Sequence, residues 1–287
     1  MKLKEIYQKS NNTPVISYEV FPPKEDIDGK KTETLFSELL ILKKYSPSLI
    51  SVTYGAGGSN QNESIDIINR IQNELNVTPM PHFTCVSTSE ENIKLYLKSI
   101  EKFGVENILA LRGDIPEDGN ICKDFKYAYE LVNCIKKQSS LSVAVAGYPE
   151  GHKEAESLAK DIDYLKKKID CGADLIYTQL FFDNNHFFSF VDLCIEKGID
   201  VPVVPGILPV TSFKQLKKMA SLCKVEIPKA FHEKLEKHKD DKDYIKKCGI
   251  EYAISQCETL VQNGIVGLHF YTLNKSKAVS EILSNIL

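Results

Sequence analysis

The stretch DCGADLIYTQ, residues 170–179, passes from a helix end through a glycine into an apolar run. Gly172 suits the left-handed backbone that ends helices, and the run from Leu175 is typical of a buried strand. The same order recurs in KFGVENILAL (102–111), EKGIDVPVVP (196–205) and QNGIVGLHFY (262–271). A helix that ends at glycine and leads directly into a strand is the αβ connection of a parallel sheet. This repetition predicts an alternating α/β fold.

Short β-rich runs are found eight times along the chain, at 15–21, 49–55, 80–86, 107–114, 141–149, 175–182, 201–208 and 267–273. Apolar residues at helical spacing lie between them, for example Ile93, Leu97 and Ile100. Eight alternating units predict an α/β protein with a (β/α)8 TIM barrel, a single domain over residues 1–287. Extra helices are expected near 212–222, 228–238 and 243–263.

An open, doubly wound sheet would show the same alternation. That fold usually carries a glycine fingerprint after its first strand, where this chain has Pro22 and Pro23. The glycine-rich turn GAGGSN (55–60) follows the second run instead, and Asn60 stands where the fingerprint needs its last glycine. The closed barrel is therefore favoured.

Composition and charge argue against several classes of function. The chain has 287 residues, of which 43% are hydrophobic and 26% charged. Its net charge of −3 gives no strongly basic surface, so neither a nucleic acid nor a membrane is expected as a partner. Because no apolar run could span a membrane or form a signal peptide, we expect a cytoplasmic protein. The eight cysteines form no C-x-x-C pair and are expected to be buried, reduced thiols. Six scattered histidines indicate no metal site.

The first run, ISYEVFPPK (16–24), places a carboxylate inside an apolar strand. Side chains alternate along a strand, so Ile16, Tyr18 and Val20 share the face that suits packing on helices. Glu19 would then point into the barrel mouth, where such barrels have their active sites. Burial there should raise its pKa toward neutrality and let it donate a proton. An ion pair in the lumen, or a position facing water, is the alternative.

Other polar residues stand at the ends of the predicted strands: Thr53 with Tyr54, His82, Arg112–Gly113–Asp114, Tyr148, Gln179, and His269 with Tyr271. Several have structural alternatives, since His82 could be a packed histidine and Asp114 part of a tight turn. Only two basic residues, Arg70 and Arg112, are arginine, and all the others are lysine. An arginine in such a chain can indicate a site that needs the planar guanidinium group, but a biased genome composition would give the same preference for lysine. These residues alone indicate a barrel enzyme for a polar, heterocyclic ligand and specify no reaction.

Eight segments together resemble methylenetetrahydrofolate reductases: SYEVFPPK, SVTYGAGG, PHFTC, ILALRGD, AGYPEGH, KKKIDCGADLIYTQLFFD, PGILPVTSFKQ and HFYTLN. They follow the family order from about Ser17 to Asn274 and match the catalytic barrel alone. The resemblance implies FAD at the barrel mouth, reduced by NADH or NADPH. Methylenetetrahydrofolate then takes the place of the nicotinamide and is reduced to methyltetrahydrofolate, which predicts ping-pong kinetics within one-carbon and methionine metabolism.

The resemblance also implies roles for individual residues. Glu19 matches the general acid and Asp114 a carboxylate near the flavin and the pterin. Cofactor contacts are implied at Thr53, His82, Arg112, Gly113, Asp114, Tyr127, Ala128, Tyr148, His152, Ala155, Asp161 and Lys168. Substrate contacts are implied at Glu19, Gln179, Phe213, Tyr271 and Lys275. Lys275, Tyr164 and Lys167 depart from arginine or more polar residues in some relatives, so affinity for the folate tail and for FAD is expected to differ.

Two other functions stay open at this point. One is a flavin-binding barrel subunit that acts only with an electron-transferring partner. The other is a flavin-free barrel lyase or aldolase for a phosphorylated substrate, although no lysine stands at the C-terminal end of a predicted strand. A homo-oligomer is expected, and the residues do not choose between NADH and NADPH.

Overall fold

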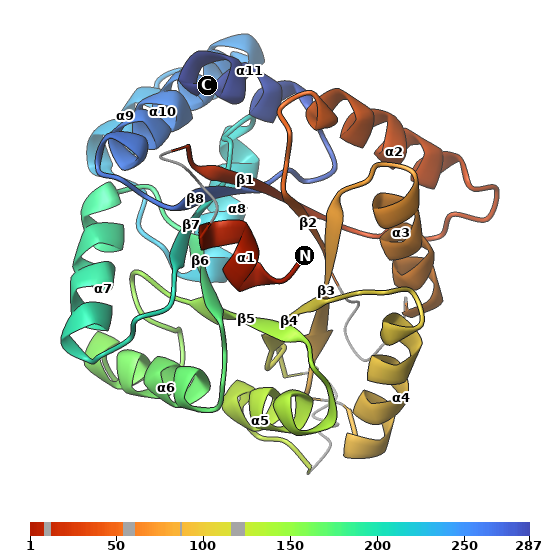
Figure 1. Ribbon diagram of the computed structural model, residues 1–287. Coiled ribbons are helices and arrows are strands. Elements are labelled where there is room, and N and C mark those ends of the chain that lie inside the picture. Colours follow the sequence, from red (N-terminus) through yellow and green to blue (C-terminus); the bar gives the residue numbers. More distant parts are fainter. Residues whose placement is uncertain (9–12, 54–60, 87, 116–123) are drawn as a thin grey trace.

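The computed structural model describes residues 1–287 except 9–12, 54–60, 87 and 116–123, with the backbone alone at 61–63. Eight parallel strands form a closed barrel in chain order (Figure 1). They are β1 (Val15–Val20), β2 (Leu49–Val52), β3 (Thr78–Thr84), β4 (Asn107–Leu111), β5 (Ser142–Gly147), β6 (Leu175–Leu180), β7 (Val203–Ile207) and β8 (Gly267–Tyr271). The predicted TIM barrel and its eight strands are confirmed, with strand ends shifted by a few residues.

Helices surround the barrel: α2 (Lys30–Lys43), α3 (Gln61–Asn73), α4 (Glu90–Glu101), α5 (Ala128–Gln138), α6 (Leu158–Asp170), α7 (Asn184–Glu196) and α11 (Lys277–Ile286). The extra helices predicted before the last strand are confirmed as α8 (Phe213–Cys223), α9 (Lys229–Glu236) and α10 (Lys242–Gln262). The short helix α1 (Leu3–Gln8) and the C-terminal helix α11 were not predicted.

Glycines end the helices where the repeated sequence pattern predicted them. Gly104, Gly172, Gly198 and Gly264 have φ angles of 69°, 104°, 66° and 75°. A side chain rarely adopts this left-handed conformation, whereas glycine does so at little cost. The αβ connections inferred from the stretch at 170–179 are therefore present at all four places.

The helix α1 closes the lower end of the barrel. Figure 1 shows it at the centre of the ring of strands, and its Leu3 and Ile6 are buried. These side chains form one cluster with inward-facing residues of the strands, among them Leu49, Met80 and Leu175. Because this end is plugged by packed apolar residues, a site has to be sought at the opposite end, where the strands have their C-termini.

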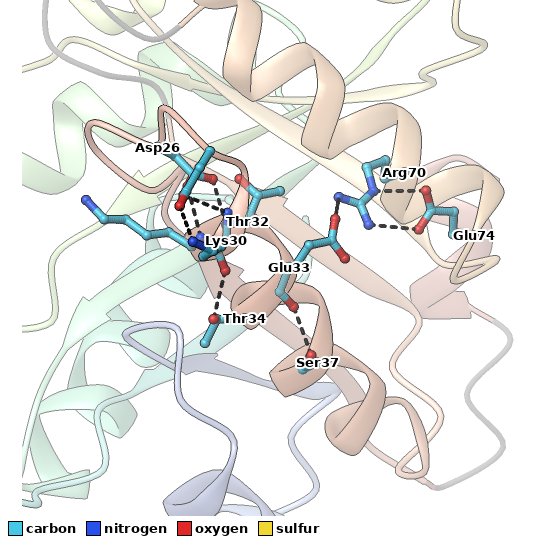
Figure 2. A network of polar contacts seen from close by, with 10 residues as sticks. Asp26, Lys30, Thr32, Glu33, Thr34, Ser37, Arg70 and Glu74 are labelled. Carbon is cyan, nitrogen blue, oxygen red and sulfur yellow. Dashed lines mark hydrogen bonds and ion pairs between the residues drawn. The ribbon is translucent and has the colours of Figure 1, made fainter.

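The first of the two arginines has a structural role. Figure 2 shows Arg70 of α3 between Glu33 of α2 and Glu74, with nitrogen–oxygen distances of 2.8 Å to Glu33 and 2.9 and 3.2 Å to Glu74. Its guanidinium also lies 3.8 Å from the ring centroid of Phe36. In the same figure Asp26 accepts hydrogen bonds from backbone N–H groups at the start of α2. The guanidinium group of Arg70 therefore joins α2 to α3.

Several expectations concern cysteines, metals and membranes. Cys122 lies outside the described residues, as do Tyr54 and the glycine-rich turn 55–60. The seven described cysteines are free, but Cys171 and Cys223 are only half-buried, so the expectation of buried thiols was wrong for these two. In the described part of the chain, no group of three or more His, Cys, Asp or Glu residues could hold a metal ion. No helix in that part is long and apolar enough to cross a membrane.

Candidate active site

Glu19 of β1 points into the upper lumen of the barrel. The alternation along β1 buries Tyr18 and Val20 against the surrounding helices, which leaves Ser17 and Glu19 facing inward. Only 9% of Glu19 is exposed, and burial raises the pKa of its carboxyl to about 8. The expected burial and the expected direction of the pKa shift are confirmed. At neutral pH this carboxyl holds a proton that it can release.

His82 of β3 is a titratable neighbour of that carboxyl. Its Nε2 lies 3.6 Å from Oε2 of Glu19, beyond hydrogen-bond distance, and accepts or donates no hydrogen bond within the described residues. Burial lowers the pKa of His82 to about 3, so both groups are uncharged near pH 7. The contact is therefore not an ion pair, and the alternative of a lumen ion pair for Glu19 is not supported.

The protonated carboxyl has a consequence for stability. The folded-state pKa of Glu19 is raised from 4.5 to about 8, so its stabilising contribution is complete below about pH 4.5 and is lost as pH rises toward 8. Glu19→Gln removes this dependence. We expect the free energy of unfolding of Glu19→Gln, relative to wild type, to rise with pH from about 5 to 8, by at most about 1.4 kcal/mol per pH unit. Urea denaturation across this range measures it, and a constant difference would contradict a buried, protonated carboxyl.

An irregularity in β6 shapes the rim next to Glu19. The pairing of β6 with β7 shifts register between Tyr177 and Leu180, and Gly206 of β7 donates its N–H to Oγ1 of Thr178 at 2.9 Å. Such bulges re-aim side chains beside active sites. Here Gln179 lies half-buried at the top of the strand, and its Oε1 accepts a hydrogen bond from the N–H of Leu180 at 2.9 Å.

Tyr271 of β8 stands opposite Glu19 in the register of β1 and β8. Its hydroxyl donates to the carbonyl of Thr178 at 2.7 Å, which ties β8 to the irregular part of β6. Burial raises the pKa of Tyr271 well above its ordinary value, and Glu19, once it is ionised, raises it further. Tyr271 therefore lies near the lumen carboxyl.

A pocket of about 220 Å³ opens beside the mouth, between the ends of β4 and β5 and the helices α5 and α6. Eight of the twelve residues implied as cofactor contacts line it: Arg112, Tyr127, Ala128, Tyr148, His152, Ala155, Asp161 and Lys168. These residues lie on five segments spread over more than fifty positions of sequence. The fold brings these residues together around one pocket.

One cation of this pocket is the guanidinium of Arg112. It forms two hydrogen bonds with the carboxylate of Glu154, at 2.6 and 2.7 Å, and its Nε donates to the carbonyl of Gly113 at 3.2 Å. The pairing with Arg112 lowers the pKa of Glu154 to about 2. The fork is thus held rigidly, and two of its five N–H groups are not used by these bonds.

The second cation is Lys168 of α6. Its ammonium group donates to the carbonyl of Ala146 at 2.7 Å, and burial lowers its pKa to about 8. Asp161, about two turns earlier on the same face of α6, is 9% exposed and accepts a hydrogen bond from the N–H of His152 at 3.1 Å. Burial raises the pKa of Asp161, while Lys168 opposes that shift. The pocket therefore combines two cations with hydrogen-bonding groups that suit an anionic, polar ligand.

The remaining residues implied by the resemblance lie elsewhere. His82 is in the lumen, and Thr53 follows β2 next to undescribed residues. Gly113 has a φ of 87°, and a Cβ there would lie 3.0 Å from Cβ of Thr84, so its conformation and the space around it both require glycine. Asp114 is exposed and pairs with Lys153 at 2.9 Å.

Phe213 and Lys275, the other two residues implied as substrate contacts, differ in their exposure. Only 7% of Phe213 is exposed, because its ring is packed in the cluster that α8 forms with α9 and α10. Its ring centroid lies 5.4 Å from that of His232. Lys275 is exposed after β8. The structure therefore places Glu19, Gln179 and Tyr271 on one rim of the barrel, and Phe213 in the neighbouring apolar cluster.

Six residues that line the pocket were not predicted as site residues: Ala110, Leu111, Tyr129, Ala146, Glu154 and Tyr164. The family resemblance marks Tyr164 only as a departure from some relatives. Aromatic residues gave a signal, since Tyr127 directly precedes α5, Tyr129 and Tyr164 lie on α5 and α6, and a parallel barrel places these two helices next to each other. Spacing within one helix could not show that they converge.

Comparisons with known proteins agree with this architecture. A family model described as Methylenetetrahydrofolate reductase matches residues 2–287. A protein from Arabidopsis thaliana named Methylenetetrahydrofolate reductase (NADH) 1 is 39% identical over 300 residues, which cover 99% of this chain and 50% of that protein. The 5,10-methylenetetrahydrofolate reductase of Buchnera aphidicola subsp. Schizaphis graminum is 38% identical over 280 residues, which cover 98% of this chain and 94% of that protein.

Among solved structures, an uncharacterized protein from Clostridium thermocellum that binds two copies of 5-methyl-5,6,7,8-tetrahydrofolic acid has a TM-score of 0.70. It is 14% identical, and the match covers 99% of this chain and 97% of that one, so it shows the fold alone. The chain spans about half the length of the plant relatives it matches and most of the length of the bacterial ones. With a family model over nearly every residue and a bacterial relative matched almost end to end, the chain belongs to the methylenetetrahydrofolate reductase family.

Proposed function

We propose that this barrel reduces 5,10-methylenetetrahydrofolate to 5-methyltetrahydrofolate with electrons from NADH or NADPH, which pass through FAD in a ping-pong reaction. The observation that carries the proposal is the buried, protonated Glu19 at the mouth of the barrel, beside a pocket with two cations. The names of the bacterial and plant relatives support the reaction, and the plant names support a nicotinamide donor.

The pocket residues fit a flavin dinucleotide. Arg112 and Lys168 supply cations for phosphate oxygens, and Asp161 and His152 supply acceptors and donors for hydroxyl groups. Arg112 keeps two N–H groups for a ligand even while it is bonded to Glu154. When bound, FAD would accept a hydride from the nicotinamide and pass it to the folate. Asp114, exposed at the mouth, would hold the pterin and lie near the flavin.

The role of Glu19 follows from its protonation. Opening of the methylene bridge requires a proton on the departing folate nitrogen, and the carboxyl of Glu19 is neutral up to about pH 8. His82 cannot take this role near pH 7, because it has no second proton to give. Gln179 and Tyr271 stand on the same rim and would orient the polar edge of the pterin.

An absorbance spectrum of the purified full chain tests the proposal. We expect flavin bands that bleach when NADH or NADPH is added without oxygen and that return when methylenetetrahydrofolate follows. A yellow protein that neither nicotinamide can reduce would favour a subunit that needs an electron-transferring partner. A colourless protein that takes up no FAD would overturn the proposal and favour the flavin-free lyase.

Location and assembly belong to the same proposal. The free state of the seven described cysteines suits a reducing compartment, which supports a cytoplasmic enzyme of one-carbon and methionine metabolism. We expect it to work as a homo-oligomer, which size-exclusion chromatography with light scattering would measure.

A further inference from the structure

Two connections at the top of the barrel are joined by two ion pairs. One connection follows β4 and includes Arg112 and Asp114, on either side of Gly113. The other lies between β5 and α6 and includes Lys153 and Glu154. The guanidinium of Arg112 bonds to Glu154, and Nζ of Lys153 lies 2.9 Å from Oδ1 of Asp114. Each connection therefore offers one cation and one carboxylate to the other, and the four charges balance.

The backbone around Lys153 is fixed on both sides. Before it, the N–H of His152 donates to Asp161 of α6 at 3.1 Å. After it, the N–H of Glu154 donates to Nδ1 of His152 at 3.2 Å. The carbonyl of Lys153 itself accepts a hydrogen bond from Nζ of Lys224 at 3.5 Å. The ammonium group of Lys153 therefore extends from an anchored backbone.

The two ion pairs face different parts of the mouth. Arg112 and Glu154 line the pocket between β4, β5, α5 and α6, whereas Lys153 and Asp114 do not line it. The side chain of Asp114 is 86% exposed and that of Lys153 is 36% exposed, so a ligand can reach this pair. The bond from Lys153 uses Oδ1 of Asp114 and leaves Oδ2 with lone pairs that can accept a further hydrogen bond. Asp114 is thus held by one oxygen and accessible at the other.

We propose that Lys153 is a positioning residue for folate reduction, which holds the carboxylate of Asp114 ready to accept N–H groups of the pterin ring through Oδ2. This inference rests on the proposed function, since it concerns the support of a residue assigned there to the pterin. A carboxylate that is held in place before the ligand arrives loses less conformational freedom when the ligand binds. Lys153 itself contacts neither the pterin nor the flavin in this arrangement.

The first test is Lys153→Met in the full chain loaded with FAD. Methionine keeps an unbranched, apolar side chain but has no cation. We expect the KM for methylenetetrahydrofolate to rise about threefold or more, the scale of immobilising one side chain on binding, with kcat within about twofold of wild type. Lys153→Arg keeps the cation and should restore most of the lost affinity. Flavin reduction by NADH or NADPH should stay close to wild type in both variants.

A double-mutant cycle shows whether Lys153 acts through Asp114. Asp114→Asn removes the charge that Lys153 pairs with, and it should raise the KM for the folate on its own. In the Asp114→Asn background, Lys153→Met should cause little further change, because the ion pair no longer exists. If Lys153→Met raises the KM by the same factor in both backgrounds, Lys153 acts on the folate directly, and the positioning role is wrong.

Lys197→Met is the matched control. Lys197, at the end of α7, forms another exposed ion pair, with Asp163 of α6 at 2.7 Å, and neither residue lines the pocket. Exposed pairs of this kind add little to folding stability, so both lysine variants should unfold at nearly the same urea concentration as wild type. Lys197→Met should leave the KM for the folate unchanged. An unchanged KM in Lys153→Met would overturn the positioning role while the reductase proposal stands, and a wild-type chain that cannot reduce methylenetetrahydrofolate would overturn both.

Discussion

Glu19→Gln is expected to lower the rate of the folate half-reaction by about 10²–10⁴-fold, the usual contribution of a general acid. Glutamine has nearly the same size and keeps the lumen packed, but it has no proton to release. Reduction of the flavin by the nicotinamide needs no proton from this position, so that half-reaction should remain close to wild type. Rapid-mixing absorbance of the flavin, first with NADH or NADPH and then with methylenetetrahydrofolate, measures the two steps separately.

The same carboxyl predicts a pH dependence. Because the pKa of Glu19 is raised to about 8, the wild-type folate half-reaction should fall as pH rises through that value, when the acid becomes ionised. Glu196→Gln, an exposed carboxyl of α7, is the matched control and should change neither half-reaction. Equal loss of both half-reactions in Glu19→Gln would show that Glu19 acts on cofactor binding or folding, and not on the folate.

Local patterns were sufficient for the barrel and for the direction of Glu19. Helix-ending glycines and eight apolar runs are properties of neighbouring residues, so they can be read without knowing the tertiary structure. The alternation of side chains along β1 then decided which face of the strand points inward. The raised pKa follows from that placement, because desolvation disfavours the charged carboxylate wherever water is excluded.

Features that depend on several elements could not be predicted in this way. The helix α1 has only six residues, and its apolar side chains find packing partners only once the barrel has closed at its lower end. The irregularity in β6 was hidden because the run 175–182 looks like a regular strand. The pocket contacts came from the family resemblance, while Glu154 and Tyr129 became visible only when their separate segments were brought together.

The second large effect is expected at Gly206, where two strands and an aromatic ring meet. A Cβ at this position would lie 2.4 Å from the carbonyl oxygen of Thr178 and 2.7 Å from Cε2 of Tyr271. The same oxygen accepts the hydroxyl of Tyr271 at 2.7 Å. Since a backbone carbonyl cannot move cheaply, Gly206→Ala has to push the tyrosine ring and the top of β6 apart. We expect it to lower the free energy of unfolding by about 1–3 kcal/mol.

Gly206→Ala should also slow the folate half-reaction, because Tyr271 stands opposite Glu19 on the rim. Flavin binding should be nearly unchanged, since neither Gly206 nor Tyr271 lines the pocket between β4, β5, α5 and α6. Gly264→Ala is the matched control: it has a φ of 75° and no atom within 4 Å of its added Cβ, so it adds backbone strain without a clash. Both variants should lose stability in urea, but only Gly206→Ala should lose folate reduction. If it retains full folate reduction despite its lower stability, the position of Tyr271 does not matter to the substrate, and the rim formed by β6 and β8 is not the folate site.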